Sequence, residues 1–241
     1  MTSSDLADLT WPHVAALRRG SDRAVGGRPG PVLAIPLGAT EQHGPHLPLS
    51  TDTDVAVALC RRLAAARPSV VVAPALPYGS SGEHAGFAGT LSIGQAAVEH
   101  VLVELCRSAT DTFDRVLLVS AHGGNAEAAT RAVHTLRSES RDVLLHLPRW
   151  EGDPHAGRPE TAMLLAIAPH LVRSQLARPG DLRPLAETLP LMRASGVGAV
   201  SQSGVLGDPT GATAGEGCQL LDDLALALVR DVDAWLASVS A

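Results

Sequence analysis

The sequence predicts an α/β fold in which a parallel β-sheet is covered by helices on both faces. Short apolar runs alternate with longer helical patterns in the order βαβαβαβ, which is typical of parallel sheets with crossover helices. The predicted strands are almost uniformly apolar, as expected for strands buried on both faces. No repeat or linker divides the 241 residues, so we expect a single domain spanning residues 1–241.

Each predicted strand is an apolar run between residues that favour turns. The first, "PVLAIPL", comes after a Pro/Gly segment, the second, "SVVVAPAL", follows Pro68, and the third, "RVLLVSA", precedes a pair of glycines. The predicted strands are residues 31–37, 69–76, 115–121 and 141–148.

The predicted helices are longer segments rich in Ala, Leu and Val. Thr10 is placed to cap the first helix, with Pro12 in its first turn, and Pro68 stops the second. Residues 170–215 are rich in Gly, Pro and Ser, so we expect irregular structure there. The predicted helices are residues 8–20, 53–66, 94–112, 126–139, 161–168 and 216–239.

The composition argues against several classes of function. The net charge is -6 without any basic cluster, which disfavours nucleic acid and anionic membranes as partners. No apolar run reaches membrane-spanning length, and the first ten residues lack a signal-peptide pattern. Cys60, Cys106 and Cys218 lie far apart, which predicts buried, reduced thiols in a cytoplasmic protein. All 19 basic residues are arginine, so lysine-based chemistry is excluded.

Side chains suited to metal binding follow the predicted strand ends, which is where parallel sheets bind ligands. Glu41 and His43 come after the first strand and point the same way if that segment is extended. His122 follows the third strand. Residues 77–92, after the second strand, are rich in Gly and Ser and too long for a tight turn, which indicates a functional loop.

Asp52 and Glu160 stand at predicted helix starts, where a carboxylate is favoured with or without a ligand. Asp52 and Asp54 are therefore also candidates for ordinary helix caps. As a set, however, the candidates form the mixed His/carboxylate group that suits zinc, manganese or iron, and a shared carboxylate suits two metals. Two metals can hold a hydroxide at neutral pH and polarise a carbonyl oxygen. The candidate ligands are Glu41, His43, Asp52, His122 and Glu160.

Other residues are candidates for contact with a substrate. Glu83 and His84 lie in the long Gly-rich loop. The backbone N–H groups from Gly123 to Asn125, at a predicted helix start, could orient substrate oxygens. His46 is near the candidate ligands, but its position favours a role in supporting its loop over a role as a ligand.

Three stretches, "GATEQHGPHLPLSTDTD", "SAHGGN" and "HAGRPETA", resemble in this order the creatininase family of metal-dependent amidohydrolases. The resemblance covers roughly residues 8–165. It implies a three-layer α/β/α fold with a mainly parallel sheet, a two-metal site, and homo-oligomers that are often hexamers.

The resemblance also implies individual roles. Glu41 and His122 match ligands of the first metal, Asp52 matches the bridging carboxylate, and His43 matches a ligand of the second metal. His155 resembles the catalytic histidine of the family and would carry a proton to the leaving nitrogen.

The chain departs from creatininase itself two residues after His122. Creatininase has a glutamate there that binds the second metal, whereas this chain has Gly124. The second metal therefore needs another carboxylate, and Glu160 is the candidate. The missing glutamate argues against creatinine as the substrate.

Within the family, "LPYGSSGEHAGFAGTLSIG" and "GVLGDPTGATAGEG" are most similar to the branch that processes a modified ribosomal peptide in mycofactocin biosynthesis. Ala88 departs from the proline found in many family members. This resemblance implies release of a C-terminal Val-Tyr dipeptide from the modified precursor. We therefore expect two divalent metal ions per chain, zinc and/or iron with manganese also compatible, in a cytoplasmic homo-oligomer.

Two other functions remain open. One is a family amidohydrolase acting on a small cyclic or formamide substrate, and the other is a metal-binding protein without turnover. A nucleotide-binding Rossmann protein is excluded, because the first strand is followed by "GATEQHG" rather than GxGxxG.

Overall fold

The sheet has four parallel strands in the order β2-β1-β3-β4. The computed structural model describes residues 4–22 and 30–238. The strands are β1 (Val32–Leu37), β2 (Val70–Val72), β3 (Arg115–Ser120) and β4 (Val143–His146). The predicted parallel sheet is therefore confirmed, and all four predicted strands are present.

The strand order places a topological switch between β1 and β3. The chain runs from β1 to β2 on one side of β1 and then crosses to β3 on the other side. The carboxyl ends of β1 and β3 are in register, with Leu37 opposite Ser120. Ligand sites in open parallel sheets form at such a switch, so the segments after these two strands are brought together at the predicted position.

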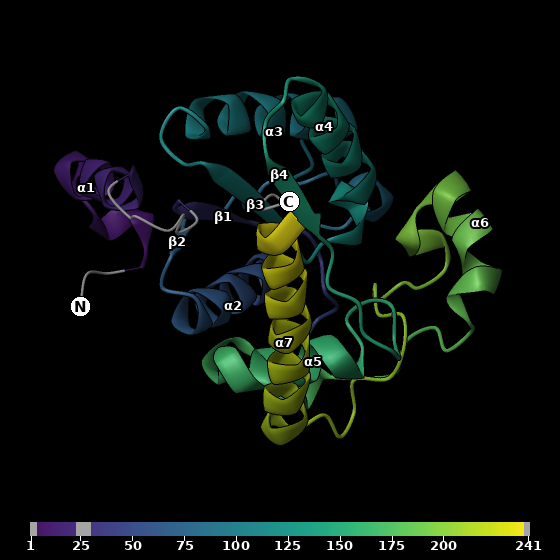
Figure 1. The fold of residues 1–241 in the computed structure, drawn as a ribbon. Helices are drawn as coiled ribbons and strands as arrows, with labels where there is room; N and C mark the ends of the chain where they lie inside the picture. Colours follow the sequence, from purple (N-terminus) through teal and green to yellow (C-terminus); the bar gives the residue numbers. More distant parts are fainter. Residues whose placement is uncertain (1–3, 23–29, 239–241) are drawn as a thin grey trace.

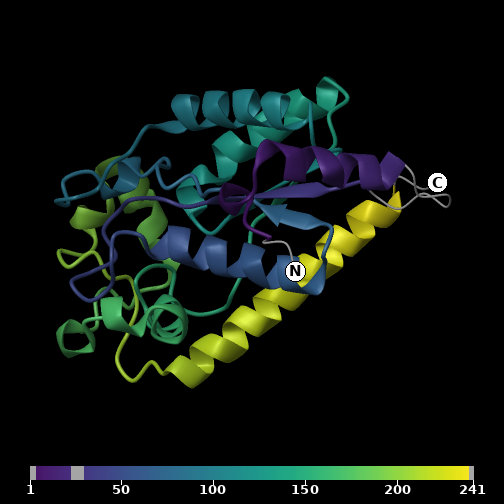
Figure 2. The same cartoon turned by 90° about the vertical axis from the view of Figure 1, so that its left-hand side faces the viewer.

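Helices cover both faces, which confirms the three-layer α/β/α architecture (Figures 1 and 2). One layer contains α2, α5 and α7, and the other contains α3 and α4 with the N-terminal α1 at its edge. The helices are α1 (Trp11–Asp22), α2 (Thr51–Ala66), α3 (Gln95–Ala109), α4 (Ala126–Ser138), α5 (Arg158–Ile167), α6 (Leu185–Ser195) and α7 (Ala214–Ser238). None of the described helices is long and apolar enough to cross a membrane.

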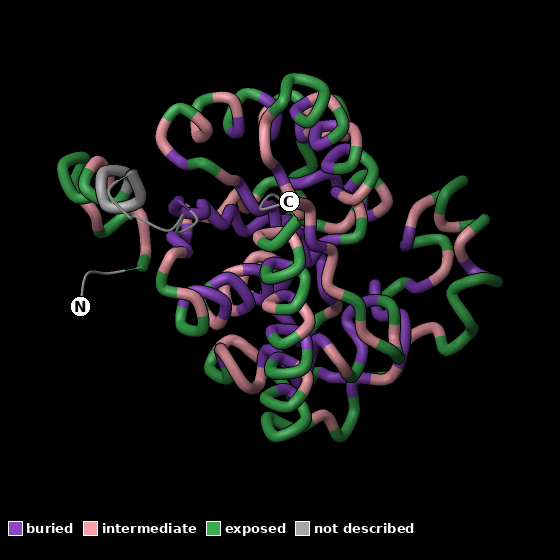
Figure 3. Tube along the Cα trace, in the orientation of Figure 1, coloured by how far each residue is buried: buried purple, intermediate pink, exposed green. Residues whose placement is uncertain are grey.

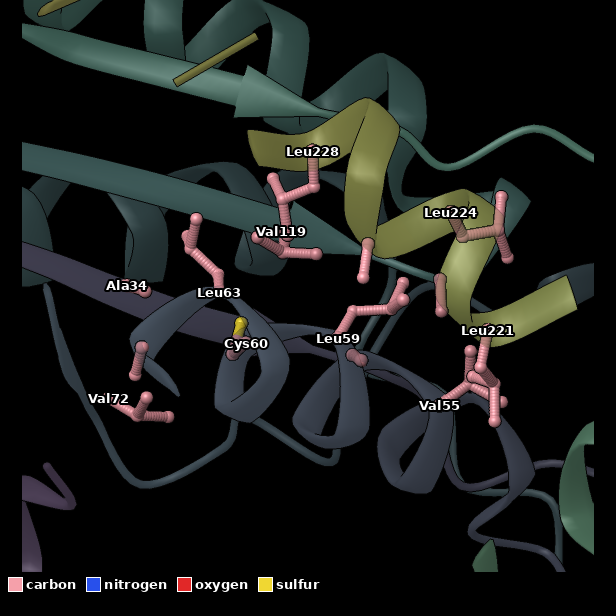
Figure 4. Packing of buried hydrophobic residues seen from close by; sticks show 14 of the residues in the cluster. Ala34, Val55, Leu59, Cys60, Leu63, Val72, Val119, Leu221, Leu224 and Leu228 are labelled. Atoms are coloured by element: carbon pink, nitrogen blue, oxygen red, sulfur yellow. The ribbon is translucent and has the colours of Figure 1, made fainter. Parts of the chain in front are cut away.

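The alternation of side chains along β1 divides the core into two parts. Val32 and Ala34 face the α2/α5/α7 layer, while Leu33 and Ile35 face the α3/α4 layer. Figure 4 shows the first part, where leucines of α2 and α7 meet over the strands. Figure 3 shows the buried positions concentrated along the sheet and the inner sides of these helices. Because helices cover both faces of the sheet, the loops of the site lie at the carboxyl ends of the strands.

Three expectations were wrong in detail. Residues 170–215 contain a helix, α6, which lies apart from both layers (Figure 1). The second strand ends at Val72, because Pro74 cannot donate to the ladder, and bridging resumes only between Leu76 and Leu37. Cys218 is exposed, although Cys60 and Cys106 are buried as expected.

Short 3-10 helices make up much of the remaining loop structure. They are Leu6–Asp8, Gly82–His84, Gly123–Asn125, Pro169–Leu171, Ser174–Leu176 and Val197–Ala199. The second and third lie at the carboxyl edge of the sheet, beside the candidate site.

Candidate metal centre

The five predicted ligands converge at the carboxyl edge of the sheet. Glu41 and His43 follow β1, His122 follows β3, and Asp52 and Glu160 lie in the first turns of α2 and α5. None of the five is more than 5% exposed. Acidic side chains are almost never buried to this degree unless they are paired or bind a metal.

Asp52 lies at the centre of the group. Its Oδ2 atom is 3.3 Å from Nδ1 of His122, and its Oδ1 atom is 3.2 Å from Nε2 of His43. Glu41 Oε2 lies 3.3 Å from His122 Nε2, and Glu160 Oε2 lies 4.0 Å from His43 Nε2. The two oxygens of Asp52 thus face two different histidines, as a bridging carboxylate would.

Three groups of side chains bring their donor atoms within 4.8 Å of one another. They are Glu41/Asp52/His122, His43/His155/Glu160 and Glu41/His84/His155. The first two overlap the two predicted metal positions, except that the second contains His155 in place of the predicted bridging residue, Asp52. The third combines residues for which we predicted other roles.

Two buried carboxylate oxygens lack a hydrogen-bond donor. Oε2 of Glu41 and Oδ2 of Asp52 are shielded from solvent and accept no hydrogen bond. Leaving a buried acceptor unsatisfied costs about 1–3 kcal/mol, and more when it is charged. Both atoms belong to the first triad, so the residues present fit a divalent cation at this position.

Three of the histidines are anchored by backbone carbonyls. His43 Nδ1 is 3.2 Å from Glu41 O, His122 Nε2 is 2.8 Å from Ser80 O, and His155 Nε2 is 2.9 Å from Gln42 O. When the outer ring nitrogen donates to a carbonyl, the other nitrogen of a neutral ring keeps a free lone pair. Metal-binding histidines use this arrangement.

The electrostatics of the site favour positive charge. Burial acts to lower the pKa of His43, but Asp52, Glu160 and Glu41 outweigh it and raise the pKa to about 10. Burial acts in the same sense on His122, where Glu41 and Asp52 raise the pKa to about 10. Divalent ions would displace these protons and supply the positive charge that the carboxylates favour.

The carboxylates respond in opposite directions. Burial raises the pKa of Glu41 and of Glu160 to about 7, and the charge of Asp52 adds to both effects. Burial also acts to raise the pKa of Asp52, but the neighbouring His43 and His122 hold it well below its usual range. Asp52 therefore stays ionised, which suits the bridging position.

The residues predicted to contact substrate differ in how far they are buried. His84 is buried with its Nε2 atom 3.2 Å from Glu41 Oε1, and burial, followed by His43 and His122, lowers its pKa to about 3. Glu83 is half-buried and Gly123 is exposed.

Asn125 is buried between two backbone segments. Its Oδ1 atom accepts the N–H of Ser80 at 2.9 Å, and its Nδ2 atom donates to Gly38 O at 2.9 Å. Asn125 thus ties the end of β1 to the Gly-rich loop, and a role in substrate binding stays a prediction.

No side chain fits at Gly124. A Cβ atom there would lie 2.2 Å from Ser80 O and 2.4 Å from His122 Nε2. A glutamate at this position would require the loop to move, while the carboxylate of Glu160 already lies 4.0 Å from His43 Nε2.

A cleft of about 600 Å³ opens onto the site. Its lining includes Glu41, His155, Arg149, Trp150 and Leu185. A second cleft of about 780 Å³ lies beside it, between the Gly82–Ala85 segment and α6. Gly123 lines both clefts, and α6 contributes residues to each.

Sequence reasoning missed Gln42, a buried residue that contacts both His84 and His155. It stands between two ligand-type residues, and in an extended segment the middle side chain points away from its two neighbours, so the sequence pattern gave no signal for it. The loop role suggested for His46 is consistent with its contact at 2.9 Å between Nε2 and the hydroxyl of Thr161.

Comparisons with known proteins identify the family and the fold. A family model described as "Creatininase: Creatinine amidohydrolase" matches residues 7–232. A "Mycofactocin precursor peptide peptidase" of Mycobacterium tuberculosis is 48% identical over 221 residues, covering 86% of each chain. One of the same name from Mycolicibacterium smegmatis is 46% identical over 213 residues, covering 85% of each. A solved structure described as "Creatininase Mn" shares the fold, with a TM-score of 0.76 at 23% identity over 96% of this chain and 98% of that chain.

Proposed function

The chain belongs to the creatininase family of metal-dependent hydrolases, and from this premise we propose that it is a peptidase acting on a modified ribosomal peptide. The names of the relatives at 46–48% identity support the mycofactocin precursor peptide as the substrate. In detail, we propose hydrolysis of an amide bond near the C-terminus that releases a Val-Tyr dipeptide.

We propose that two divalent ions, zinc and/or iron or else manganese, complete the site. Glu41, Asp52 and His122 would hold the first, and His43, Asp52 and Glu160 the second. The unsatisfied oxygens of Glu41 and Asp52 support this assignment. When bound, such a pair supplies a water-derived nucleophile at neutral pH and polarises the scissile carbonyl.

His155 is the proposed proton carrier. Its Nε2 atom is anchored 2.9 Å from Gln42 O, so Nδ1 faces the site, 3.9 Å from Glu41 Oε1. A neutral imidazole with a free lone pair here can accept a proton from the nucleophile and return it to the leaving nitrogen. His155 also lines the cleft, which gives it access to substrate.

A peptide substrate is supported by the pair of clefts that share Gly123 in their linings. A small cyclic substrate needs only the first cleft, whereas an extended peptide occupies space on both sides of the scissile bond. The exposed backbone at Gly123 lies between the two and is placed to contact the peptide near that bond.

The first cleft also offers a cation for a terminal carboxylate. Arg183 is held by a bidentate ion pair with Asp181. Arg149 lines the same cleft and makes no ion pair or hydrogen bond with the residues that the structure describes. We propose that Arg149 binds the C-terminal carboxylate of the peptide, as guanidinium groups commonly bind carboxylates.

The wider setting is proposed on the same basis. We propose a single domain over residues 1–241, a cytoplasmic location and assembly into a homo-oligomer, with no nucleic-acid or membrane partner. The net charge of -6 supports the last point.

The test is incubation of the metal-loaded protein with the modified precursor peptide, followed by mass spectrometry. The expected result is a released Val-Tyr dipeptide and a correspondingly shortened precursor. Turnover of a cyclic or formamide substrate with an intact precursor would favour the alternative amidohydrolase. Full metal content without turnover of either class would favour a non-catalytic metal-binding protein.

A further inference from the structure

The third triad, Glu41/His84/His155, shares Glu41 with the first proposed metal position and includes the proposed proton carrier, His155. Its donor atoms lie within 4.8 Å of one another, as in the other two triads, so distance alone does not exclude a metal there. The hydrogen bonds around Gln42 distinguish the triads.

The side-chain amide of Gln42 has only one orientation that suits its neighbours. The N–H of Gly44 donates to Oε1 at 2.9 Å, and Nε2 donates to the carbonyl of Gly204 at 3.2 Å. If the amide were turned over, its NH₂ group would face the N–H of Gly44, and its oxygen would face the carbonyl oxygen of Gly204.

Gly204 permits this close contact. Its φ is +79°, and a Cβ atom would lie 1.8 Å from Gln42 Oε1. The amide is thus fixed by backbone groups that do not titrate, and its NH₂ group is directed at the histidines.

This orientation sets the proton position on His84. Its Nδ1 atom lies 2.8 Å from Gln42 Nε2, a donor, so Nδ1 is the acceptor. The proton of the ring is then on Nε2, which faces Glu41 Oε1 at 3.2 Å. A metal at Nε2 would require this proton to move to Nδ1, where it would face the NH₂ group of Gln42, so His84 acts instead as a hydrogen-bond donor to Glu41.

His155 takes up the complementary arrangement. The two amide hydrogens of Gln42 serve His84 and Gly204, so the 3.0 Å contact with His155 Nε2 is not a third donation. His155 Nε2 instead donates to the backbone oxygen of Gln42 at 2.9 Å, and its Nδ1 lone pair faces the site. Gln42 thus donates to His84 through its side-chain amide and accepts from His155 through its backbone oxygen.

We propose that Gln42 is a positioning residue that fixes these two tautomers and so prevents metal binding by the third triad. Through His84 it also orients Glu41, whose Oε1 atom is occupied by the His84 N–H while Oε2 remains for the first metal. The inference about metal exclusion rests on the proposed metal centre, but the two tautomers are properties of the metal-free chain.

The test is nitrogen-15 NMR of the histidine rings, which separates protonated from unprotonated ring nitrogens. Metal-free wild-type protein should show the proton on Nε2 of both His84 and His155. After zinc loading, His84 should keep its Nε2 proton. A proton on Nδ1 of His84, or loss of its Nε2 proton on zinc loading, would overturn the proposal.

Two variants test the role of Gln42 itself. In Gln42→Glu the carboxylate accepts from His84, so the proton should move to Nδ1 and zinc should then bind Nε2 of His84. In Gln42→Met, which keeps a similar volume without a donor, His84 should populate both tautomers. An unchanged His84 tautomer in both variants would show that Gln42 does not set it.

The NMR result is independent of catalysis. Failure of the peptidase assay or of zinc binding would count against the proposed function without altering the wild-type tautomers. Correct turnover together with an Nδ1 proton on His84 would overturn only the role of Gln42. If Gln42→Glu does not fold, the wild-type spectrum and Gln42→Met still decide the question.

Discussion

Replacement of Glu160 by glutamine separates a ligand role from a structural one. Glu160 is buried in the first turn of α5, and its Oε2 atom accepts the N–H of Ala156 at 2.5 Å. Glutamine keeps the shape and an acceptor oxygen. A hydrogen bond to a charged group contributes about 1.5–3 kcal/mol and a neutral one about 0.5–1.5 kcal/mol, so the structural loss is about 1 kcal/mol. Because glutamine is neutral, the cost of burying a charge disappears, and this offsets part of the lost stability.

The metal-free Glu160→Gln variant should therefore melt within about 2–4 °C of the wild type. The loss of a metal ligand has a larger effect. Lewis-acid stabilisation contributes several kcal/mol, and each 1.36 kcal/mol is tenfold in rate, so kcat should fall about 10²-fold or more. Zinc content should fall from two ions to one.

The assay combines elemental analysis after zinc loading and desalting, thermal unfolding without metal, and peptide turnover. Glu216→Gln is the matched control, because Glu216 also lies in the first turn of a helix but is exposed and pairs with Arg158. The control should keep both metals and full turnover. Two zinc ions with near-normal turnover in Glu160→Gln would refute the ligand role.

Three further variants test other parts of the site. Asp52→Ala should lose both metals in elemental analysis, whereas Asp54→Ala, in the same turn of α2, should keep them; one retained metal would contradict bridging. His155→Ala should keep both metals and lose turnover by about 10²–10⁴-fold, and a loss of metal along with rate would make it a ligand. Arg149→Gln should raise KM about 10-fold with kcat unchanged, and only for a peptide with a free C-terminal carboxylate. An equal effect on the C-terminally amidated peptide would exclude carboxylate recognition.

The position of the site followed from the sequence because parallel strands share one ligand-binding edge. Glu41 and His43 lie in the segment after β1, and His122 lies in the segment after β3, so predicting these strands also placed the three residues. Asp52 required only that α2 begin beside the same edge. These residues depend on local patterns and on one general rule of sheet topology.

Tertiary contacts account for what the sequence did not predict. Gln42 acts through His84 and His155, which lie 42 and 113 positions away, and no local pattern records those contacts. α6 contains Pro190 in a segment rich in Gly and Pro, so the propensity of its residues pointed to irregular structure. The lack of space at Gly124 is set by Ser80 and His122 and is visible only in three dimensions.

The central claim is that two metals share Asp52 at the carboxyl edge of the sheet. The most direct test is an anomalous difference map from crystals of the zinc-loaded protein. The account predicts two peaks about 3.5–4 Å apart, one beside Glu41 and His122 and the other beside His43 and Glu160, each in contact with an oxygen of Asp52. A single peak, or a peak held by Glu41, His84 and His155, would contradict it.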